Sequence, residues 1–364
     1  MSNHSGSLTK LALQKFKKNF WGVLSFWIIV AIGFISVFAY LIAPDDSQNA
    51  NQMHLSIHSK SPGFKVTLLS LPSELEIDQS FISKLFFGKL KTDVEIPISE
   101  YRIDKGKLRY TEYASDGLIG VEKSVNLSRF PNDNYLSFIK EKTFIFGTDK
   151  YGRDLLSRVL VGSRISFFIG FIAVFISLVI GIAMGSIAGY YGGKIDALIM
   201  WIINVTWSIP TLLLVIAITL ALGKGFWQVF IAVGLTMWVE VARVVRGQII
   251  SAKEMQYVTA AKALGFNNYR IITKHILPNI MAPIIVISAA NFAAAILIES
   301  GLSFLGIGAQ PPMSSWGAMI KDHYNYIILG KPYLALIPGL CIMILVMAFM
   351  LIGNALRDAL DVKT

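Results

Sequence analysis

Few side chains of this 364-residue chain are placed to do chemistry. Two acids, Glu240 and Glu299, stand in or beside long apolar runs. A charge at the centre of a bilayer costs at least ~2.5 kcal/mol, so each acid is a functional candidate. Glu240 precedes Arg243 by three residues, which favours an ion pair within one helix over a proton-binding site. We expect Glu299 where the fifth apolar run meets the outer membrane face.

Nucleotide, metal and thiol chemistry have little support in the sequence. No Gly-Lys pair is followed by Ser or Thr, so the ATP-binding loop motif is missing. His54 and His58 have the spacing of a weak metal-site pattern, but a solvated surface pair explains them better. The single cysteine, Cys341, cannot form a disulfide within the chain. We expect no catalytic residue, no metal site and no cofactor in this chain.

The composition indicates a membrane protein, with 54% hydrophobic and only 15% charged residues and a mean hydropathy of +0.59. A helix needs about 20 apolar residues to cross a bilayer. A run at 225–239 reaches that length if Glu240 is included and Arg243 and Arg246 extend to the interface. The prediction is an all-α polytopic fold with six transmembrane helices, the other five in the runs 19–44, 165–193, 197–223, 275–298 and 332–356.

The distribution of basic residues predicts the orientation of these spans. The first 20 residues contain four lysines and no acid, so the N-terminus and, after six spans, the C-terminus are expected in the cytoplasm. The basic loop 251–279 falls on the same side. Residues 44–158 hold 16 basic and 16 acidic residues, so this segment can be translocated. The net charge of +10 therefore reflects topology, and we expect no nucleic-acid partner.

These patterns divide the chain into four expected segments. They are a cytoplasmic N-terminus (1–20), transmembrane helix 1 (21–43), an extracytoplasmic insert (44–145) and a membrane core (146–364). The first helix has no clear cleavage site and is expected to remain as an anchor. In the insert, DVEIPISEY and KLRYTEY alternate in hydrophobicity near the turn signals DKG and SDG. These patterns favour a small β-rich lobe, although a loosely ordered insert is the alternative.

Small residues recur every four positions in SLVIGIAMGSIAG. Such spacing puts them on one helix face, where another helix can approach closely. A static packing contact is favoured over a seam that slides during function. The residues of this expected helix-packing seam are Ser177, Gly181, Gly185 and Gly189.

The charged loop 251–279 has the pattern of two short helices joined at Gly265, where a positive φ would turn the chain. Asn267 and Asn268 are cap candidates for the second helix, and Pro278 is expected to break it. One face of the first helix would hold Tyr257, Ala260, Ala261 and Leu264; one face of the second, Ile271, Ile272, His275 and Ile276. The pair would form a knob for a groove in a soluble partner. These features alone favour a plain amphipathic loop.

The loop YVTAAKALG, followed by HILPN, resembles the conserved cytoplasmic loop of ATP-binding-cassette importer permeases. In that family the loop is the coupling helix, which docks on the ATPase subunit. Thr259 replaces the glutamate of the family's Glu-Ala-Ala triplet. The resemblance implies a coupling role for Tyr257, Thr259, Ala260, Ala261, Leu264, Gly265, His275, Leu277 and Pro278.

Three further stretches narrow the resemblance to the C-type permease subunit of the oligopeptide/dipeptide (and nickel) importers: 146–166, 208–218 and 299–317. This implies a non-enzymatic subunit of the bacterial cytoplasmic (inner) membrane that forms half of a pore. Its implied partners are a homologous permease, two ATPases that bind ATP and Mg²⁺, an extracytoplasmic substrate-binding protein and membrane lipid. The expected pore or substrate path includes Trp207, Pro210 and Glu299.

Three alternatives stay open. The first is a permease of the same family for nickel or another small solute. The second is an ion-driven secondary transporter, which would be expected to bury several ionisable groups or to have broken helices, and the sequence shows neither clearly. The third places function in the insert, as a docking or sensing lobe for the binding protein.

Overall fold

The structure, a computed structural model, describes residues 8–73, 79–90, 93–115, 118–131, 134–223 and 225–360. It divides into two compact units. Unit 1 comprises Met1–Gly33, Ser166–Gln310 and Leu340–Thr364, and unit 2 comprises Phe34–Ile165 and Pro311–Gly339. Three helices have residues in both units: α2 (Phe20–Val37), α5 (Leu155–Tyr191) and α13 (Tyr333–Leu360).

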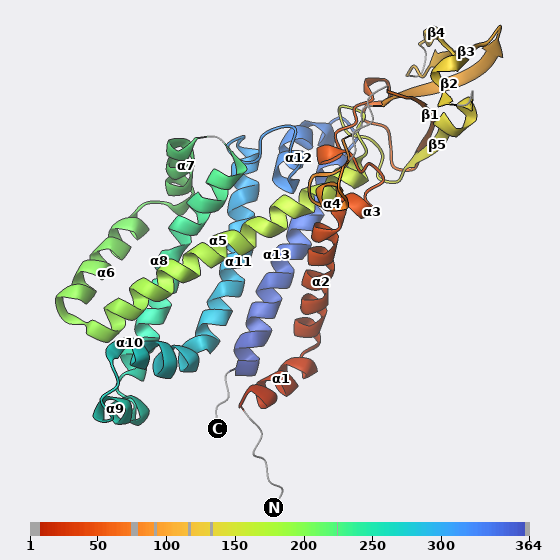
Figure 1. Cartoon of the computed structure of the whole chain (residues 1–364). Coiled ribbons are helices and arrows are strands. Elements are labelled where there is room, and N and C mark those ends of the chain that lie inside the picture. The colour runs from red at the N-terminus through yellow and green to blue at the C-terminus, as the bar shows by residue number, and fades with distance from the viewer. Residues whose placement is uncertain are drawn as a thin grey trace, which may run out of the picture. The chain divides into compact units, whose positions relative to one another are not determined.

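Unit 1 is helical (Figure 1). Besides its parts of α2, α5 and α13 it contains α1 (Leu8–Lys18), α6 (Gly193–Ser208), α7 (Thr211–Leu222), α8 (Phe226–Ala252), α9 (Gln256–Ala263), α10 (Asn268–Arg270), η6 (Ile271–Ile276), η7 (Leu277–Ile280) and α11 (Met281–Phe304). Within the described residues five helical stretches are long and apolar enough to cross a membrane, or six if α6 and α7 count as one bent span. The fold is therefore mostly helical with five or six candidate spans.

The expected span 197–223 is broken rather than continuous. Helices α6 and α7 meet at an angle of 93°. Pro210 lacks an N–H group and disfavours helical geometry at the residue before it, and Ile209 is accordingly extended with φ −92° and ψ 129°. The sequence-based statement that no helix is clearly broken is wrong at this position.

The small residues of α5 lie against α8. A Cβ atom added to Gly181 would lie 2.8 Å from the Trp238 carbonyl oxygen, and one added to Gly185 would lie 2.5 Å from that of Ala242. One turn further on, a Cβ at Gly189 would lie 2.8 Å from the Arg246 carbonyl oxygen. Ser177 is buried and its hydroxyl donates to the Val174 carbonyl of its own helix. The two backbones thus approach closely over about two turns.

Unit 2 contains a five-stranded antiparallel sheet in the order β4-β3-β2-β1-β5. The strands are β1 (Phe64–Leu71), β2 (Val94–Asp104), β3 (Lys107–Glu112), β4 (Glu122–Asn126) and β5 (Ile139–Phe144). Alternating residues of β1, β2 and β3 form a small apolar core around Leu69, Ile98 and Leu108. The expected turn at DKG joins β2 to β3 through Lys105 and Gly106, both with positive φ. In the other expected turn, SDG, Asp116 and Gly117 lie outside the described residues.

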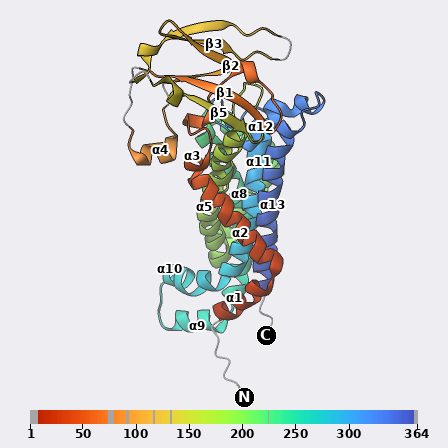
Figure 2. The same ribbon diagram turned by 90° about the vertical axis from the view of Figure 1, so that its right-hand side faces the viewer.

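Short helices complete unit 2. They are α3 (Ala39–Ile42), η1 (Gln48–Ala50), η2 (Leu55–Ile57), α4 (Phe81–Phe87), η3 (Leu127–Arg129), η5 (Tyr135–Phe138), α12 (Trp316–His323) and η8 (Tyr324–Ile327). Figure 2 shows α3 and α4 side by side, and both belong to this unit. The sequence-based prediction did not include α4 or α12 as helices.

Gly185→Ala is expected to destabilise the protein, because the added methyl group would meet an Ala242 carbonyl that cannot rotate away. Overpacking of this kind costs about 1–3 kcal/mol. Gly247→Ala is the matched control, since Gly247 also lies in a helix but has open space within 4 Å of its Cβ position. Thermal unfolding of both variants in lipid nanodiscs measures the difference. Equal midpoints would contradict close packing of α5 on α8.

Candidate functional site

The loop between α8 and α11 forms two short helical segments, as the spacing predicts. Helix α9 ends at Ala263, and Gly265 then adopts φ +77°. The Asn267 side chain caps α10 by accepting a hydrogen bond from the Arg270 N–H at 2.8 Å. Gly265 therefore turns the chain and Asn267 starts the second segment.

Helix α9 has an inner and an outer face. Val258 and Ala261 are buried and pack in one cluster with Val245 and Ile249 of α8. Tyr257, Ala260 and Leu264 are exposed, and Leu264 shows 72% of its surface. The prediction that Ala261 shares the exposed face is wrong, because the 100° step between neighbouring residues turns its side chain into the core. We call Tyr257, Ala260 and Leu264, with the neighbouring exposed Thr259, the α9 outer face.

Aromatic contacts hold the second segment, and the sequence patterns did not indicate them. The Phe266 ring stacks on the half-buried His275 ring at 5.5 Å and 17°, and the Arg270 guanidinium lies 4.1 Å from the Phe266 ring centre. Tyr190, at the end of α5, donates a 2.9 Å hydrogen bond to the Asn268 side chain. The sequence signal that could have predicted these contacts is Phe266, an aromatic residue directly after the turn glycine Gly265.

Pro278 does not end the second segment, contrary to the prediction. The chain passes from α10 through the π-helical η6 and the 3₁₀-helical η7 into α11. Pro278 is near the start of η7, where a missing N–H is tolerated. Leu277 and Pro278 therefore join the loop to α11 within one continuous helical stretch, Asn268–Phe304.

Several chain segments gather at one end of unit 1. In Figures 1 and 2, α1, α9, α10 and the last residues of α13 lie at this end. Three lysines, Lys15, Lys17 and Lys18, stand in the last turn of α1. The loop adds the exposed Lys262, Arg270 and Lys274. This end of unit 1 is strongly basic.

A second feature of unit 1 is a cavity of about 190 Å³ at the break between α6 and α7. Trp207 lies beside it with its ring 3.7 Å from the Arg243 guanidinium, which also donates to the Asn204 side chain at 2.8 Å. The lining residues come from four helices and the connection between α6 and α7: Thr206, Trp207, Ile209, Thr211, Leu214, Thr236, Met237, Val239, Glu240, Ala294 and Ile298.

Glu240 is exposed to this cavity. The expected ion pair with Arg243 is not formed within the described residues, because Arg243 turns to Asn204 and Trp207. Arg246 instead makes a bidentate pair with Asp196, at 2.5 and 2.6 Å, that joins α8 to α6. Glu240 is thus the one acid among the residues that line the cavity.

The three residues expected in the pore or substrate path have different positions. Trp207 lines the cavity and Pro210 stands at the break beside it. Glu299 is buried, accepts a 2.7 Å hydrogen bond from the Ser303 hydroxyl and is not among the lining residues. Ser303 in turn accepts from the Ala309 N–H at 3.2 Å, so Glu299 holds the loop after α11.

In unit 2 a buried charged cluster surrounds the start of α5. Asp149 accepts a 2.7 Å bond from the Arg153 side chain and lies 3.6 Å from Arg158. The Ser157 hydroxyl donates to Asp154 and accepts from the Asp45 N–H at 2.8 Å. Burial raises the pKa of the Asp154 carboxyl. The stretch 146–166 therefore fixes the start of α5 through internal pairs.

His323 at the end of α12 lies next to this cluster in unit 2. Its Nδ1 lies 2.7 Å from the Met319 carbonyl, and its Nε2 lies 3.5 Å from the Lys150 N–H. Lys150 also pairs with Asp322 at 3.0 Å. Burial lowers the pKa of His323, with the Met319 carbonyl as the largest opposing influence. The neutral ring, donating from Nδ1 and accepting at Nε2, satisfies both neighbours.

The family described as binding-protein-dependent transport system inner membrane component matches residues 181–364. These residues include the cavity, the charged loop and the three seam glycines Gly181, Gly185 and Gly189. The chain belongs to this family. A second family, the N-terminal transmembrane domain of oligopeptide transport permease C, matches residues 7–62. The protein is a C-type permease subunit of an oligopeptide/dipeptide ATP-binding-cassette importer family.

Two relatives show the degree of similarity. The permease resembles the dipeptide transport system permease protein DppC of Bacillus subtilis, with 44% identity over 218 residues that cover 60% of this chain and 68% of DppC. It also resembles the oligopeptide transport system permease protein OppC of Escherichia coli strain K12, with 40% identity over 61% of this chain and 74% of OppC. Among solved structures, a chain of the inward-facing MetNI methionine ABC transporter aligns with a TM-score of 0.47 and 18% identity, covering 56% of this permease and 95% of itself.

His323 is expected to make the stability of the permease depend on pH. Its folded pKa lies below its unfolded value, so its contribution is complete above about pH 6.5 and falls as the pH drops below that. The loss is about 1.4 kcal/mol for each pKa unit that separates the two states. Thermal unfolding in nanodiscs at pH 7.5 and pH 5 measures it.

His323→Gln is the control, because its amide has no proton to gain in this range. The variant should lose less stability between the two pH values than the natural permease. An identical loss in both proteins would contradict the role assigned to His323.

Proposed function

We propose that this permease imports oligopeptides or dipeptides as half of a two-subunit pore driven by ATP hydrolysis on partner subunits. The observation that carries the substrate class is the identity of 44% and 40% to proteins named as dipeptide and oligopeptide permeases. The partners we propose are a homologous permease, two cytoplasmic ATPases that bind ATP and Mg²⁺, and an extracytoplasmic binding protein.

The α9 outer face is proposed to dock in a groove of one ATPase. It offers Tyr257, Ala260 and Leu264 on the exposed side of a helix whose other side is packed on α8. A small central residue flanked by two large ones suits a helix-in-groove contact. Thr259 adds a hydroxyl in place of a carboxylate, so docking here depends on shape more than on an ion pair.

The basic end of unit 1 is proposed to face the cytoplasm. It joins the lysines of α1 with those of the loop, as the positive-inside rule requires. Closure of the ATPases would then move α9 and, through the continuous winding of η6 and η7, α11. In this proposal residues 44–145 lie on the outside, where the binding protein arrives.

The cavity at the α6–α7 break is proposed to lie on the substrate path. A backbone break inside a membrane is tolerated where it lines a cavity, and such breaks mark substrate sites in transporters. Glu240 supplies a negative charge there, and Trp207 with the threonines supplies a polar, aromatic wall. A peptide carries an α-ammonium group, for which the Glu240 carboxylate is a complementary partner.

A broken helix and an acid in a cavity would also suit an ion-driven carrier. The sequence-based argument against that class relied in part on unbroken helices and no longer holds. Family membership favours ATP-driven import instead.

Gly265→Val is expected to uncouple ATP hydrolysis from uptake in the reconstituted complex. Gly265 has a positive φ, where a side chain costs about 1–2 kcal/mol, so the turn between α9 and α10 would shift. Gly330→Val is the matched control, because Gly330 has φ +74° and equally open surroundings. We expect ATPase activity without uptake only for Gly265→Val; normal uptake in that variant would count against the coupling role.

Glu240→Gln is expected to weaken import of peptides with a free amino terminus roughly tenfold, because a charged hydrogen bond worth about 1.5–3 kcal/mol becomes a neutral one. Import of N-acetylated peptides should change little. Glu254→Gln, at an exposed acid of the loop, is the control variant. Competition uptake into proteoliposomes measures each ratio, and an equal effect on both peptide types would exclude Glu240 as an ammonium partner.

A further inference from the structure

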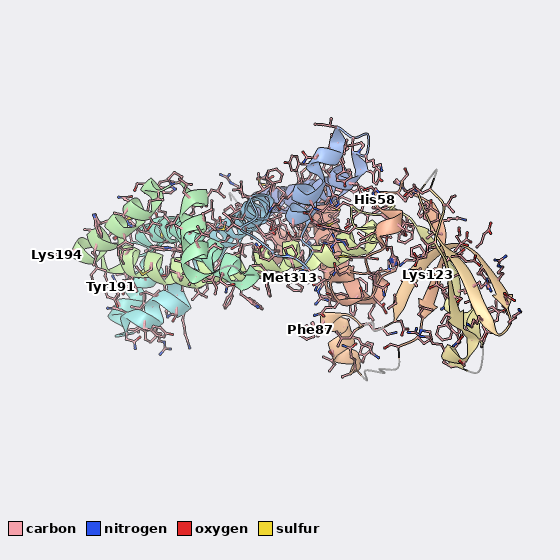
Figure 3. All side chains as sticks on the ribbon, turned by 90° about the horizontal axis from the view of Figure 1, so that it is seen from above. His58, Phe87, Lys123, Tyr191, Lys194 and Met313 are labelled. Carbon is pink, nitrogen blue, oxygen red and sulfur yellow. The ribbon has the colours of Figure 1, made fainter. Side chains whose placement is uncertain are left out.

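Helix α4 of unit 2 presents an apolar surface that is largely exposed among the residues the structure describes. Phe81, Ile82, Phe86 and Phe87 expose 65%, 67%, 49% and 65% of their surfaces. Figure 3 shows the Phe87 side chain on α4, and Figure 2 shows this helix standing apart from the strands. The adjacent α3 adds the exposed Leu41 and Ile42. So large an apolar patch on one short segment indicates an interaction surface.

The helix is held rigidly by backbone contacts. After α4 the chain turns at Gly88, where an added Cβ would lie 2.8 Å from the Tyr40 ring and 3.0 Å from the Gln48 backbone. The Lys89 N–H donates to the Asp46 carbonyl at 2.7 Å, and the Gln48 N–H donates to the Lys89 carbonyl at 3.2 Å. These contacts hold the C-terminal end of α4 against Tyr40 of α3 and against η1.

Arg164 of α5 fixes the position of α4 along the axis of α5. Its guanidinium donates to the Leu85 carbonyl at 3.0 Å and lies 4.9 Å from the Tyr40 ring centre. Arg164 is the last charged residue before the uncharged run 165–193 of α5. Arginine at the end of such a run marks the membrane boundary. The bond to Leu85 places α4 at the same level.

The connection from α2 to α3 also places this surface at the membrane boundary. Helix α2 is a candidate membrane span that ends at Val37. Helix α3 begins two residues later, at Ala39. Phe34 and Phe38, at this exit, have ring centres 4.6 Å apart, and Phe34 is 59% exposed. Helix α4 carries one charge, Lys84, and no acid, so it contains nothing that repels phosphate headgroups.

We propose that α4, together with α3, lies in the interfacial layer of the membrane at the outer ends of α2 and α5, with Phe81, Ile82, Phe86 and Phe87 inserted among the lipid chains. Short amphipathic elements bind such interfaces through buried apolar area. The anchored helix fixes the height of residues 44–145 above the bilayer. This inference does not depend on which solute is carried.

The test uses the complete transporter in lipid nanodiscs, with Phe87→Cys in a Cys341→Ala background and an environment-sensitive fluorophore on the new thiol. We expect blue-shifted emission, strong quenching by nitroxide-labelled lipids and weak quenching by aqueous iodide. Ile119→Cys is the control, because Ile119 is 98% exposed in the same unit. Its label should respond to iodide and not to the lipid quencher.

Two results would overturn the proposal. Iodide quenching at position 87 as strong as at position 119 would mean that α4 is in water. Protection from both quenchers would mean that another protein, such as the partner permease or the binding protein, covers α4. Ile82→Cys repeats the measurement with the same expectations if the Phe87 variant does not assemble.

Discussion

The close approach of α5 and α8 is the contact on which the rest of unit 1 depends. Three glycines of α5 lie against carbonyl groups of α8 and beside the side chains of Val241, Val245 and Ile249, so α8 approaches the α5 backbone closely. Close packing of this kind transmits displacement with little loss. Both functional features lie on α8, since its middle carries Glu240 and its end packs against α9. The seam therefore joins the cavity and the charged loop to one rigid pair.

Polar side-chain pairs fix the position of α6 against α8, which the contact between α5 and α8 does not determine. Arg246 and Asp196 join α8 to α6, and this pair fixes the first turn of α6 beside α8. Arg243 covers Trp207 at the far end of α6. Bidentate and stacked arginine contacts are directional, in contrast to apolar packing. The position of Glu240 in the cavity follows, because its nearest arginines are both engaged elsewhere.

Local rules made part of this structure predictable. Gly265 at a turn, Asn267 as a cap and the four-residue spacing of Gly181, Gly185 and Gly189 each follow from the conformational properties of one residue type. Four of the five uncharged runs coincide with long apolar helices for the same reason, since length and charge decide where such helices form, but the run 197–223 is broken at Pro210. The small sheet was the weaker inference, because residues 44–158 hold 16 acidic and 16 basic residues, which leave little for a core.

Other features could not be read from the sequence because they depend on competition between partners. Arg243 could pair with Glu240 one turn away or reach Asn204 and Trp207, and only the packing of α6 decides between them. Ala261 and Ala260 are identical side chains, and one faces the core while the other faces solvent. Pro278 breaks a helix only if no altered winding can absorb it, and here η6 and η7 do so.

The two-faced character of α9 has a consequence for how such transporters diversify. Its inner residues, Val258 and Ala261, are shared with the core of the permease and cannot change without disturbing α8. Its outer residues, Tyr257, Thr259, Ala260 and Leu264, are exposed. If the α9 outer face docks on an ATPase as proposed, a gene duplicate could acquire a new ATPase by changing Tyr257, Thr259, Ala260 and Leu264. On that proposal, transporters for different solutes could share an ATPase or use separate ones after a few substitutions on the α9 outer face, with the packing on α8 unchanged.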